Sequence, residues 1–250
     1  MDTDGTSFAL PPKRTLTEDV IEQLRNAIFR GYFAPGQRLS EEQLARSLKV
    51  SRGPIREALV RLEREGLISS QANRRTIVAQ LSRRDLEEVY TIRLALERLA
   101  VQYAVHYAQP KDLEALEANT QQLEDAVARG ITEHEAAALD IGFHDLIYRA
   151  AGHEHVLHAW LNIRSQVYLF LLSRNLANPD FRDRVISRGH REILDALKQR
   201  DEERAVQFIE EHLRAGYAYI YQNYPGQNGS SESTEPGPLG DLAPRLPLPK

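Results

Sequence analysis

One carboxylate and three imidazoles in the second half of the sequence have spacings that would let them meet around a metal ion. Asp140 and His144 are four residues apart, so in a helix they project from the same face. His190 and His212 are equidistant from residue 201, where a turn between antiparallel helices would bring them to one level of a bundle. This donor set suits zinc, nickel or manganese better than calcium or magnesium. The alternative is that each histidine is a hydrogen-bonded polar residue between helices.

A second set of residues, nearer the N-terminus, suits contacts with DNA. Arg52 and Arg56 share one face in the first turns of a predicted helix, away from its apolar stripe. A guanidinium can pair with both acceptors of guanine in the major groove, and Ser51 with the amides at the helix start can hold a phosphate. Arg74 and Arg75, at the tip of a predicted hairpin, could reach phosphates or the minor groove. The alternative for the helical arginines is a solvated face.

Three helices and a hairpin are expected to position these arginines. Thr15, Ser40 and Ser51 stand where helix caps are needed. Residues 67–70 and 76–79 have strand character and are joined by a polar link. This order of elements predicts a winged helix-turn-helix.

The second half of the sequence has helical periodicity throughout. A long helix begins after Ser82 and ends before Pro110, and short loops separate it from the helices that follow. We therefore predict a mainly α protein whose C-terminal part is an antiparallel bundle of six helices, with seven as the alternative. The five later helices are expected at about 112–129, 132–151, 153–175, 180–199 and 201–222.

Charge and composition divide the chain in the same way. The segment 13–81 carries a balance of +5, whereas the sequence from residue 82 onward carries −7, which suggests two modules with different partners; chance scatter is the alternative. The predicted parts are a disordered tail (1–13), a DNA-binding domain (14–80), a helical domain (82–222) and a disordered tail rich in proline, glycine and serine (225–250).

Composition also excludes several classes of protein. There are no cysteines, so a disulfide scaffold, a cysteine nucleophile and thiolate zinc sites are ruled out. The longest apolar run, 167–172, is far shorter than the roughly 20 residues of a membrane span. The first residues are acidic where a signal peptide would be basic. We therefore expect a soluble, cytoplasmic protein with no membrane partner.

The first 80 residues contain a set of motifs that resembles the DNA-binding domain of GntR-family bacterial transcription regulators. The resemblance implies a homodimer on a short palindromic operator in double-stranded DNA, with contacts from Arg38, Ser51, Arg52 and Arg56. The motifs are 34–39 (APGQRL), 44–45 (LA), 50–59 (VSRGPIREAL), Leu62 and 65–67 (EGL).

Two departures from that family pattern bear on the DNA contacts. Gly53 stands where the family often has a hydroxyl residue, which removes one contact. Asn73, Arg74 and Arg75 replace the usual glycine-rich wing tip, which leaves the wing contacts open.

Residues 82–222 resemble the FCD-type ligand-binding domain of the FadR subfamily, and six helices suggest its VanR-like branch. The resemblance implies a divalent transition metal, zinc first, held by Asp140, His144, His190 and His212. It further implies a small organic-acid effector in a cavity beside the metal.

Two arginines are candidates for that effector pocket. Arg93 matches a family position that often faces the pocket, and a salt bridge with Glu97 at i+4 is the equal alternative. Arg164 is a second, weaker candidate.

These features favour a ligand-controlled transcription regulator, expected to be a repressor that releases its operator when the acid binds. It would act in the bacterial cytoplasm and associate with the nucleoid when bound to DNA. One alternative is a DNA-binding protein with a purely structural metal and no effector. Another is a metalloenzyme, but 134–138 (HEAAA) lacks the second histidine of a zinc protease, and Ser187 and Ile209 stand where a di-iron site needs glutamate. We therefore expect no enzymatic activity.

Overall fold

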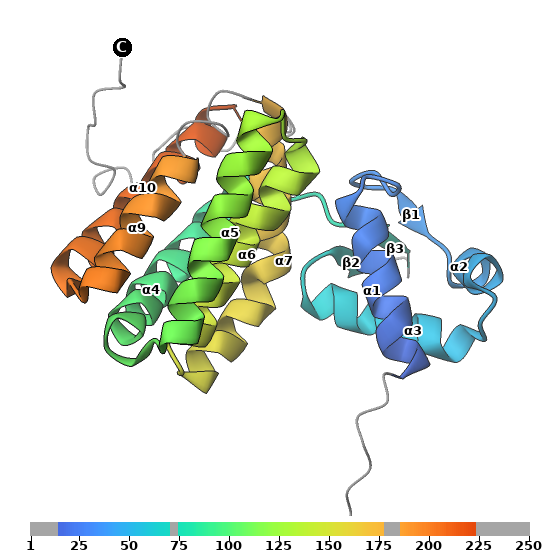
Figure 1. Cartoon of the computed structure of the whole chain (residues 1–250). Coiled ribbons are helices and arrows are strands. Elements are labelled where there is room, and N and C mark those ends of the chain that lie inside the picture. The colour runs from blue at the N-terminus through green and yellow to red at the C-terminus, as the bar shows by residue number, and fades with distance from the viewer. Residues whose placement is uncertain (1–14, 71–74, 178–185, 224–250) are drawn as a thin grey trace, which may run out of the picture. The chain divides into compact units, whose positions relative to one another are not determined.

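The computed structural model of the chain describes residues 15–70, 75–177 and 186–223, and helices dominate it (Figure 1). The mainly α fold class, with an N-terminal helix-turn-helix and a C-terminal helical domain, is therefore confirmed. The chain forms two compact units, Met1–Gln80 and Leu81–Lys250. Both predicted tails and Arg74 lie outside the described residues.

Three helices of the first unit begin at the predicted capping residues. Thr15 caps α1 (Leu16–Phe29) in a reciprocal capping box with Glu18. The Ser40 hydroxyl accepts a hydrogen bond from a backbone N–H at the start of α2 (Glu41–Leu48). Ser51 occupies the N-cap position of α3 (Arg52–Arg64), but its side chain makes no capping hydrogen bond. The Ser51 hydroxyl and the first backbone N–H groups of α3 therefore lack the capping hydrogen bond that is present in α1 and α2.

The sheet of this unit has three strands, one more than the predicted hairpin. Strand β1 (Arg38–Leu39) pairs antiparallel with β3 (Thr76–Val78), which also pairs with β2 (Ile68–Ser70) in the order β1-β3-β2. Gly36 makes the turn before β1 with a φ of +79°, which a side chain would strain. Two residues are too few to show alternation in the sequence, so β1 was missed.

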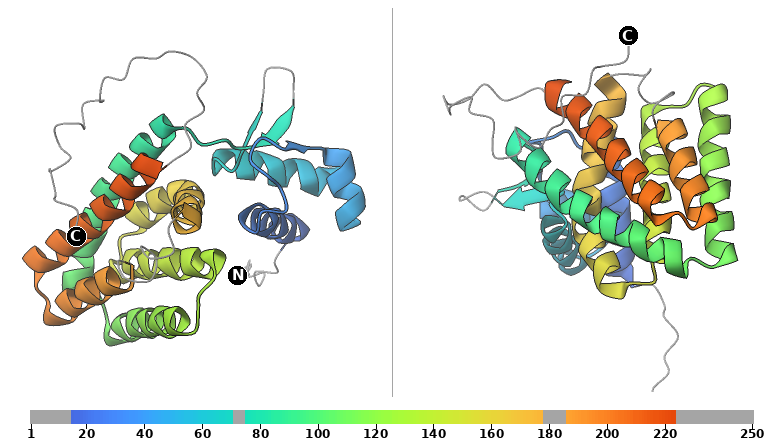
Figure 2. Two further views of the ribbon diagram at one scale, coloured as in Figure 1. Left: turned by 90° about the horizontal axis from the view of Figure 1, so that it is seen from above. Right: turned by 90° about the vertical axis from the view of Figure 1, so that its left-hand side faces the viewer.

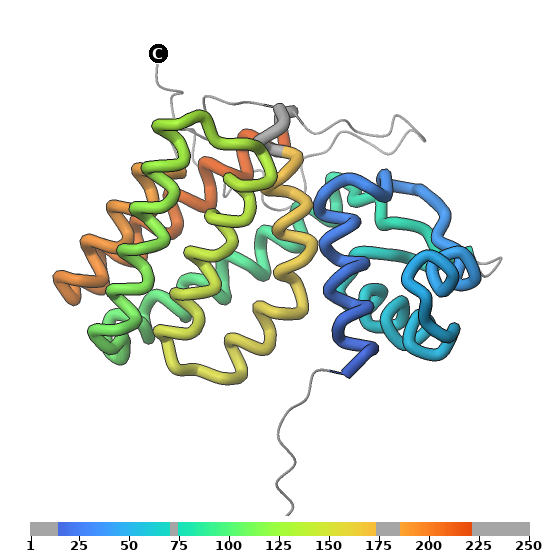
Figure 3. The backbone as a smooth tube through the Cα atoms, turned by 45° about the vertical axis from the view of Figure 1, so that its right-hand side comes forward, coloured from blue at the N-terminus to red at the C-terminus, as the bar shows by residue number. Residues whose placement is uncertain are grey.

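The core of the first unit is the apolar stripe predicted on α3. Ile55, Ala58, Leu59 and Leu62 are all buried, and α3 packs against α1 (Figure 3). The ion pair between Arg25 and Glu65, at 2.8 Å, joins α1 to the end of α3.

Six helices make up the described part of the second unit (Figure 2). The connections from α4 to α5, α5 to α6, α6 to α7 and α9 to α10 are short, as predicted. Helix α4 packs along α10, α5 along α6, α6 along α7 and α9 along α10. Helix α9 begins at Ser187, and the predicted helical residues 180–185 lie outside the described residues. The bounds are α4 (Arg83–Tyr107), α5 (Pro110–Ala128), α6 (Glu133–Ala150), α7 (Glu154–Ala177), α9 (Ser187–Gln199) and α10 (Glu202–Asn223).

The turn between α9 and α10 is fixed by Arg200. This residue ends α9 in the left-handed region, with a φ of +58°. Its guanidinium donates to the carbonyl oxygens of Val105 at 2.6 Å and Ala108 at 2.7 Å, which lie at the C-terminal end of α4. These carbonyls lack partners within their own helix. One side chain therefore ties the hairpin of α9 and α10 to α4.

Removing buried volume from the second unit should destabilise it strongly. Leu123 is fully buried in a cluster formed by α5, α6 and the start of α9. We expect Leu123→Ala to lower the free energy of unfolding of this unit by about 2–5 kcal/mol, because the residual cavity adds to the lost transfer energy. Urea unfolding followed by emission of Trp160, the single tryptophan of the chain, measures the effect.

The matched control is Leu161→Ala, because that leucine is 46% exposed in the same unit. Its expected cost is within about 0.5 kcal/mol. Equal losses for the two variants would contradict the assignment of Leu123 to the core.

Candidate metal centre and DNA-contacting face

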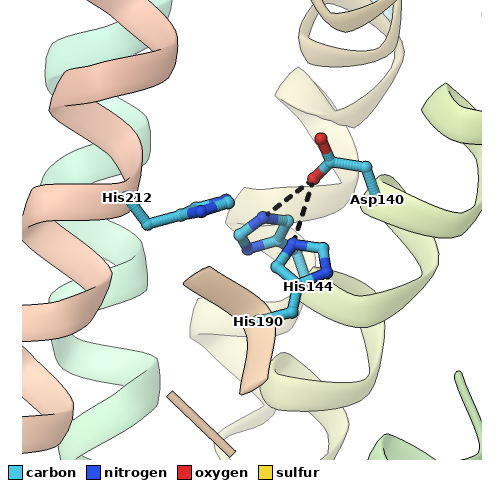
Figure 4. Close-up of side chains that lie close together, drawn as sticks. All are labelled: Asp140, His144, His190 and His212. Carbon is cyan, nitrogen blue, oxygen red and sulfur yellow. Dashed lines mark ion pairs between the residues drawn. The ribbon is translucent and has the colours of Figure 1, made fainter. Parts of the chain in front are cut away.

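Four buried side chains from three helices converge in the second unit. Asp140 and His144 come from α6, His190 from α9 and His212 from α10 (Figure 4). One ligand atom from each lies within 4.8 Å of the others. The i, i+4 spacing on α6 and the mirror positions on α9 and α10 thus bring together the four residues that the sequence singled out.

His144 is held from both sides by carboxylates. Its Nε2 lies 3.2 Å from Asp140 Oδ1, and its Nδ1 lies 2.6 Å from Glu97 Oε2. Glu97 is fully buried on α4 and also accepts a hydrogen bond from Arg93 Nε at 2.5 Å. The chain from Arg93 through Glu97 to His144 fixes the orientation of the imidazole, as a carboxylate does behind a metal-bound histidine.

His190 and His212 are positioned by packing against their neighbours. The His190 ring stacks on Phe143, with centroids 4.0 Å apart, and its Nε2 lies 3.4 Å from Asp140 Oδ1. His212 approaches the backbone of α9 so closely that a Cβ at residue 189 would lie 2.6 Å from its Nδ1. Glycine at position 189 therefore makes room for the His212 ring.

The surroundings of His144 and His212 shift the pKa values of these two imidazoles in opposite directions. Burial and the neighbouring His190 and His144 hold the pKa of His212 well below its ordinary value, so this ring is neutral at pH 7. Burial also opposes charge on His144, but the carboxylates of Glu97 and Asp140 together outweigh it, and the pKa of His144 is raised. Burial alone would raise the pKa of Glu97, but Arg93 and His144 lower it.

The donor set fits a divalent transition ion. His212 Nδ1 is buried without a hydrogen-bond partner, an arrangement that costs free energy in an apolar interior. A neutral imidazole is the form that binds metals. Three imidazoles and one carboxylate suit zinc or a related first-row ion. The four residues could hold such an ion at the centre of the bundle.

A cavity adjoins the four-residue cluster. Arg93 and His212 are part of its wall. Arg93 can both pair with Glu97 and serve the cavity. Its Nε binds Glu97, whereas its Nη2 is buried without a hydrogen-bond partner.

The other arginine proposed for the effector pocket is engaged elsewhere. Arg164 pairs with both carboxylate oxygens of Asp145, at 2.7–2.9 Å. The indole N–H of Trp160 also donates to Asp145, at 2.7 Å. Among the described residues, Arg164 is not part of the cavity wall.

Those residues proposed to contact DNA that the structure describes lie on the surface of the first unit. Ser51, Arg52 and Arg56 are exposed on the first turns of α3. Arg38 is exposed on β1, and Arg75 is exposed at the residue preceding β3, the strand that pairs with β1.

Glu41, at the start of α2, connects the two arginines of α3. Its Oε2 lies 3.2 Å from Arg56 Nη2 and 3.7 Å from Arg52 Nη2. The sequence analysis missed this contact, although Glu41 is the residue directly after the cap of α2. The carboxylate holds both guanidinium groups on one face while leaving them about two-thirds exposed.

Comparison with known proteins identifies the class. The sequence model of the FCD domain matches residues 88–215, and that of bacterial regulatory proteins of the gntR family matches residues 16–78. The chain belongs to the GntR family and carries an FCD domain. It is a DNA-binding transcription regulator and not an enzyme.

Particular relatives extend over most of the chain. An uncharacterized HTH-type transcriptional regulator, YdhC of Bacillus subtilis, is 34% identical over 76% of this chain and 84% of its own length. A probable D-xylose utilization operon transcriptional repressor of Paenarthrobacter nicotinovorans is 31% identical over 85% of this chain and 91% of its own. The solved structure of E. coli McbR/YncC has a TM-score of 0.71 at 27% identity, covering 85% of this chain and 100% of its own.

FCD domains bind small-molecule effectors and can bind metals, which agrees with a buried His/Asp cluster beside a cavity. In the portion of the chain with described coordinates, no helix is long and apolar enough to cross a membrane.

Because His212 lies close to α9, a substitution on α9 should weaken metal binding without removing any of the four candidate ligands. We expect Gly189→Ala to weaken zinc binding by about tenfold or more, because the new methyl group displaces the His212 ring. Competition with a chromophoric chelator measures the affinity. Gly53→Ala is the control, since a Cβ at that helical glycine meets nothing within 4 Å. Equal zinc affinity in both variants would show that residue 189 does not position His212.

Proposed function

We propose that this protein is a homodimeric repressor that binds a palindromic operator and releases it when an organic acid binds its metal-loaded helical unit. The observation that carries the proposal is the buried Asp/His cluster beside a cavity whose wall includes an arginine, in a chain with a GntR DNA-binding domain. The repressor activity named for the Paenarthrobacter relative supports the direction of control. The site of action is the bacterial cytoplasm, with nucleoid association when the protein is bound to DNA.

In this proposal Asp140, His144, His190 and His212 hold the metal, zinc first, with nickel or manganese as alternatives. A bound divalent ion supplies a Lewis acid with coordination positions open to a carboxylate oxygen. Glu97 keeps His144 in the tautomer that presents Nε2 to the cluster.

DNA binding is assigned to the face of α3 that carries Arg52 and Arg56. The N-terminal turns of a recognition helix enter the major groove, where arginine pairs with guanine. Ser51 and the α3 amides would bind phosphate, because the hydroxyl is not used in capping. Arg38, Arg74 and Arg75 would contact the backbone or the minor groove. A symmetric dimer requires matching half-sites.

Helix α4 is the element suited to couple the two events. It contributes Leu86, Val89, Tyr90 and Arg93 to the cavity wall. Only four residues separate its first residue from the end of β3. An effector that prefers one packing of α4 would therefore bias the position of the DNA-binding unit through the chain itself.

The deciding experiment is selection of bound sequences from a random duplex library at two salt concentrations. We expect a palindrome whose binding survives the higher salt, because base contacts add to the salt-sensitive phosphate contacts. Affinity for the recovered operator is then measured with zinc and with organic acids. An operator affinity that no acid changes would favour the alternative, a purely structural metal.

Removing one guanidinium of α3 should weaken and relax DNA recognition. We expect Arg52→Ala to cost about 1–3 kcal/mol of operator binding and to loosen the preference at one base pair. Fluorescence anisotropy with operator variants measures both. Arg129→Ala in the second unit is the control, because it removes the same charge from a side chain of similar exposure, 58% against 63%. If Arg129→Ala lost as much operator affinity as Arg52→Ala, the loss would be due to net charge and not to a contact made by Arg52.

Metal affinity should rise with pH. The pKa of His144 is raised in the metal-free protein, so a proton competes with the metal at pH values above the ordinary imidazole pKa of about 6.5. Zinc affinity is therefore expected to be weaker at about pH 6 than at about pH 8, with a proton released on binding. Calorimetry in buffers of different ionisation enthalpy measures both quantities. Binding without pH dependence and without proton release would contradict the assignment of His144 as a ligand.

A further inference from the structure

In the cavity beside the four-residue cluster, the polar and the apolar side chains of the wall lie at different ends. It lies entirely within the second unit, between α4, α7 and α10. Among the described residues, its charged or imidazole side chains are Arg93 and His212, and the rest of the described wall is aliphatic or aromatic apart from one glycine. The apolar and aromatic residues are Leu86, Val89, Tyr90, Val167, Phe170, Leu171, Leu213, Tyr217 and Ile220.

The order of these groups along the cavity follows from the pairing of α4 with α10. Tyr90 stacks on Tyr217, with ring centroids 4.2 Å apart. Further along, Arg98 forms an ion pair with Glu210 at 3.2 Å. As the residue number rises on α4 it falls on α10, so the two helices run antiparallel.

This antiparallel alignment places the polar groups at one end. Arg93 and His212 lie on the metal side of the tyrosine pair, whereas Leu86 and Ile220 lie beyond it. Arg93 and Leu86 are seven positions apart on α4, which corresponds to roughly 10 Å along the axis. The site therefore has a short polar end and a longer apolar arm.

The polar end is complementary to one carboxylate. Arg93 is only 8% exposed, and its Nη2 has no hydrogen-bond partner, while Glu97 holds its Nε. A buried guanidinium with one side occupied can bind one anionic group with its other side.

The apolar arm offers little to a second polar group. Burial is the main cause that raises the pKa of both Tyr90 and Tyr217, so their hydroxyl groups stay neutral. Arg214 interacts with the Tyr90 hydroxyl and is not part of the cavity wall. A second carboxylate or a row of hydroxyl groups on the ligand would be desolvated here without adequate partners, which is unfavourable.

We infer that the effector is a monocarboxylate with an apolar body, bound with its carboxylate at Arg93 and the metal and its body between the tyrosine pair and α7. Sugar acids and dicarboxylates are excluded as preferred ligands. The separation of Leu86 from Arg93 along α4 matches a body up to roughly 10 Å long. This inference rests on the proposed function, since it specifies the ligand class of the same effector site.

The test compares three six-carbon acids that differ in their hydroxyl groups and in the number of carboxylates: hexanoate, gluconate and adipate. Calorimetry uses the zinc-loaded full-length protein. We expect hexanoate to bind at least about tenfold more tightly than either of the others, because their additional polar groups would be buried in the apolar arm. Gluconate or adipate binding as tightly as hexanoate would overturn the ligand class. Failure of all three acids, and of acetate as well, would overturn the effector site itself.

A change in the arm tests the orientation of the ligand. Gly216 lines the cavity from α10, so Gly216→Val fills part of the arm. We expect the affinity for hexanoate to fall about tenfold. The affinity for acetate should not change, because acetate needs only the polar end. Unchanged zinc affinity and Trp160 emission in this variant report an intact bundle. Equal loss for both acids in an intact variant would contradict the orientation.

A second variant guards against a folding defect in the first. Ile220→Ala lengthens the apolar end, because Ile220 lies beyond the tyrosine pair. It should shift the preference from hexanoate toward octanoate, and an unchanged preference would argue against a body that reaches this end. Operator release is measured separately. An acid that binds but does not release DNA would contradict the repressor mechanism and leave the ligand class intact.

Discussion

A carboxylate and three imidazoles buried among helices impose the constraint around which the second unit is arranged. Groups of this kind are costly in an apolar interior unless each finds a partner. Here Asp140 faces two of the rings, and Glu97 faces His144 from the opposite side. The carboxylate of Glu97 in turn requires Arg93. Satisfying the polar centre therefore recruits side chains from α4, α6, α9 and α10, which fixes how these helices pack.

Helix α4 links the buried polar cluster to the turn between α9 and α10, to the cavity and, along the chain, to the DNA-binding unit. Its C-terminal carbonyls are bound by Arg200, which sets the turn that brings His190 and His212 to one level. Its middle carries Glu97 and Arg93, and its first half forms one wall of the cavity. Its N-terminus follows the DNA-binding unit after a short connection. The support of His144, part of the cavity wall and the connection to the DNA-binding unit thus share one helix.

The parts of this arrangement that the sequence predicted are those with a local period. Residues at i and i+4 share a helix face whatever the helix packs against, which is why Asp140 and His144 could be paired. His190 and His212 could be matched because a single tight turn relates their levels. The same logic predicted the buried stripe of α3 from Ile55 to Leu62.

What the sequence could not show depends on contacts between elements. The ion pair of Glu97 with His144 joins two helices that are not consecutive, and no spacing rule relates their registers. The need for glycine at 189 arises only when α10 approaches α9. The third strand escaped prediction because β1 is two residues long and gains its identity from β3. Arg164 looked available as a pocket residue, but Asp145 binds its guanidinium.

The contact of Glu41 with Arg52 and Arg56 has a consequence for how the protein searches a chromosome. A carboxylate beside two guanidinium groups reduces the positive potential that α3 presents to any phosphate backbone, and that potential governs binding to arbitrary sequence. At a matching site of the proposed complex the loss would be offset, because guanine acceptors would replace the carboxylate as partners for the arginines. In the proposed complex, one acidic residue on α2 would thus shorten the residence of the protein on non-matching sites and increase the ratio of specific to non-specific affinity.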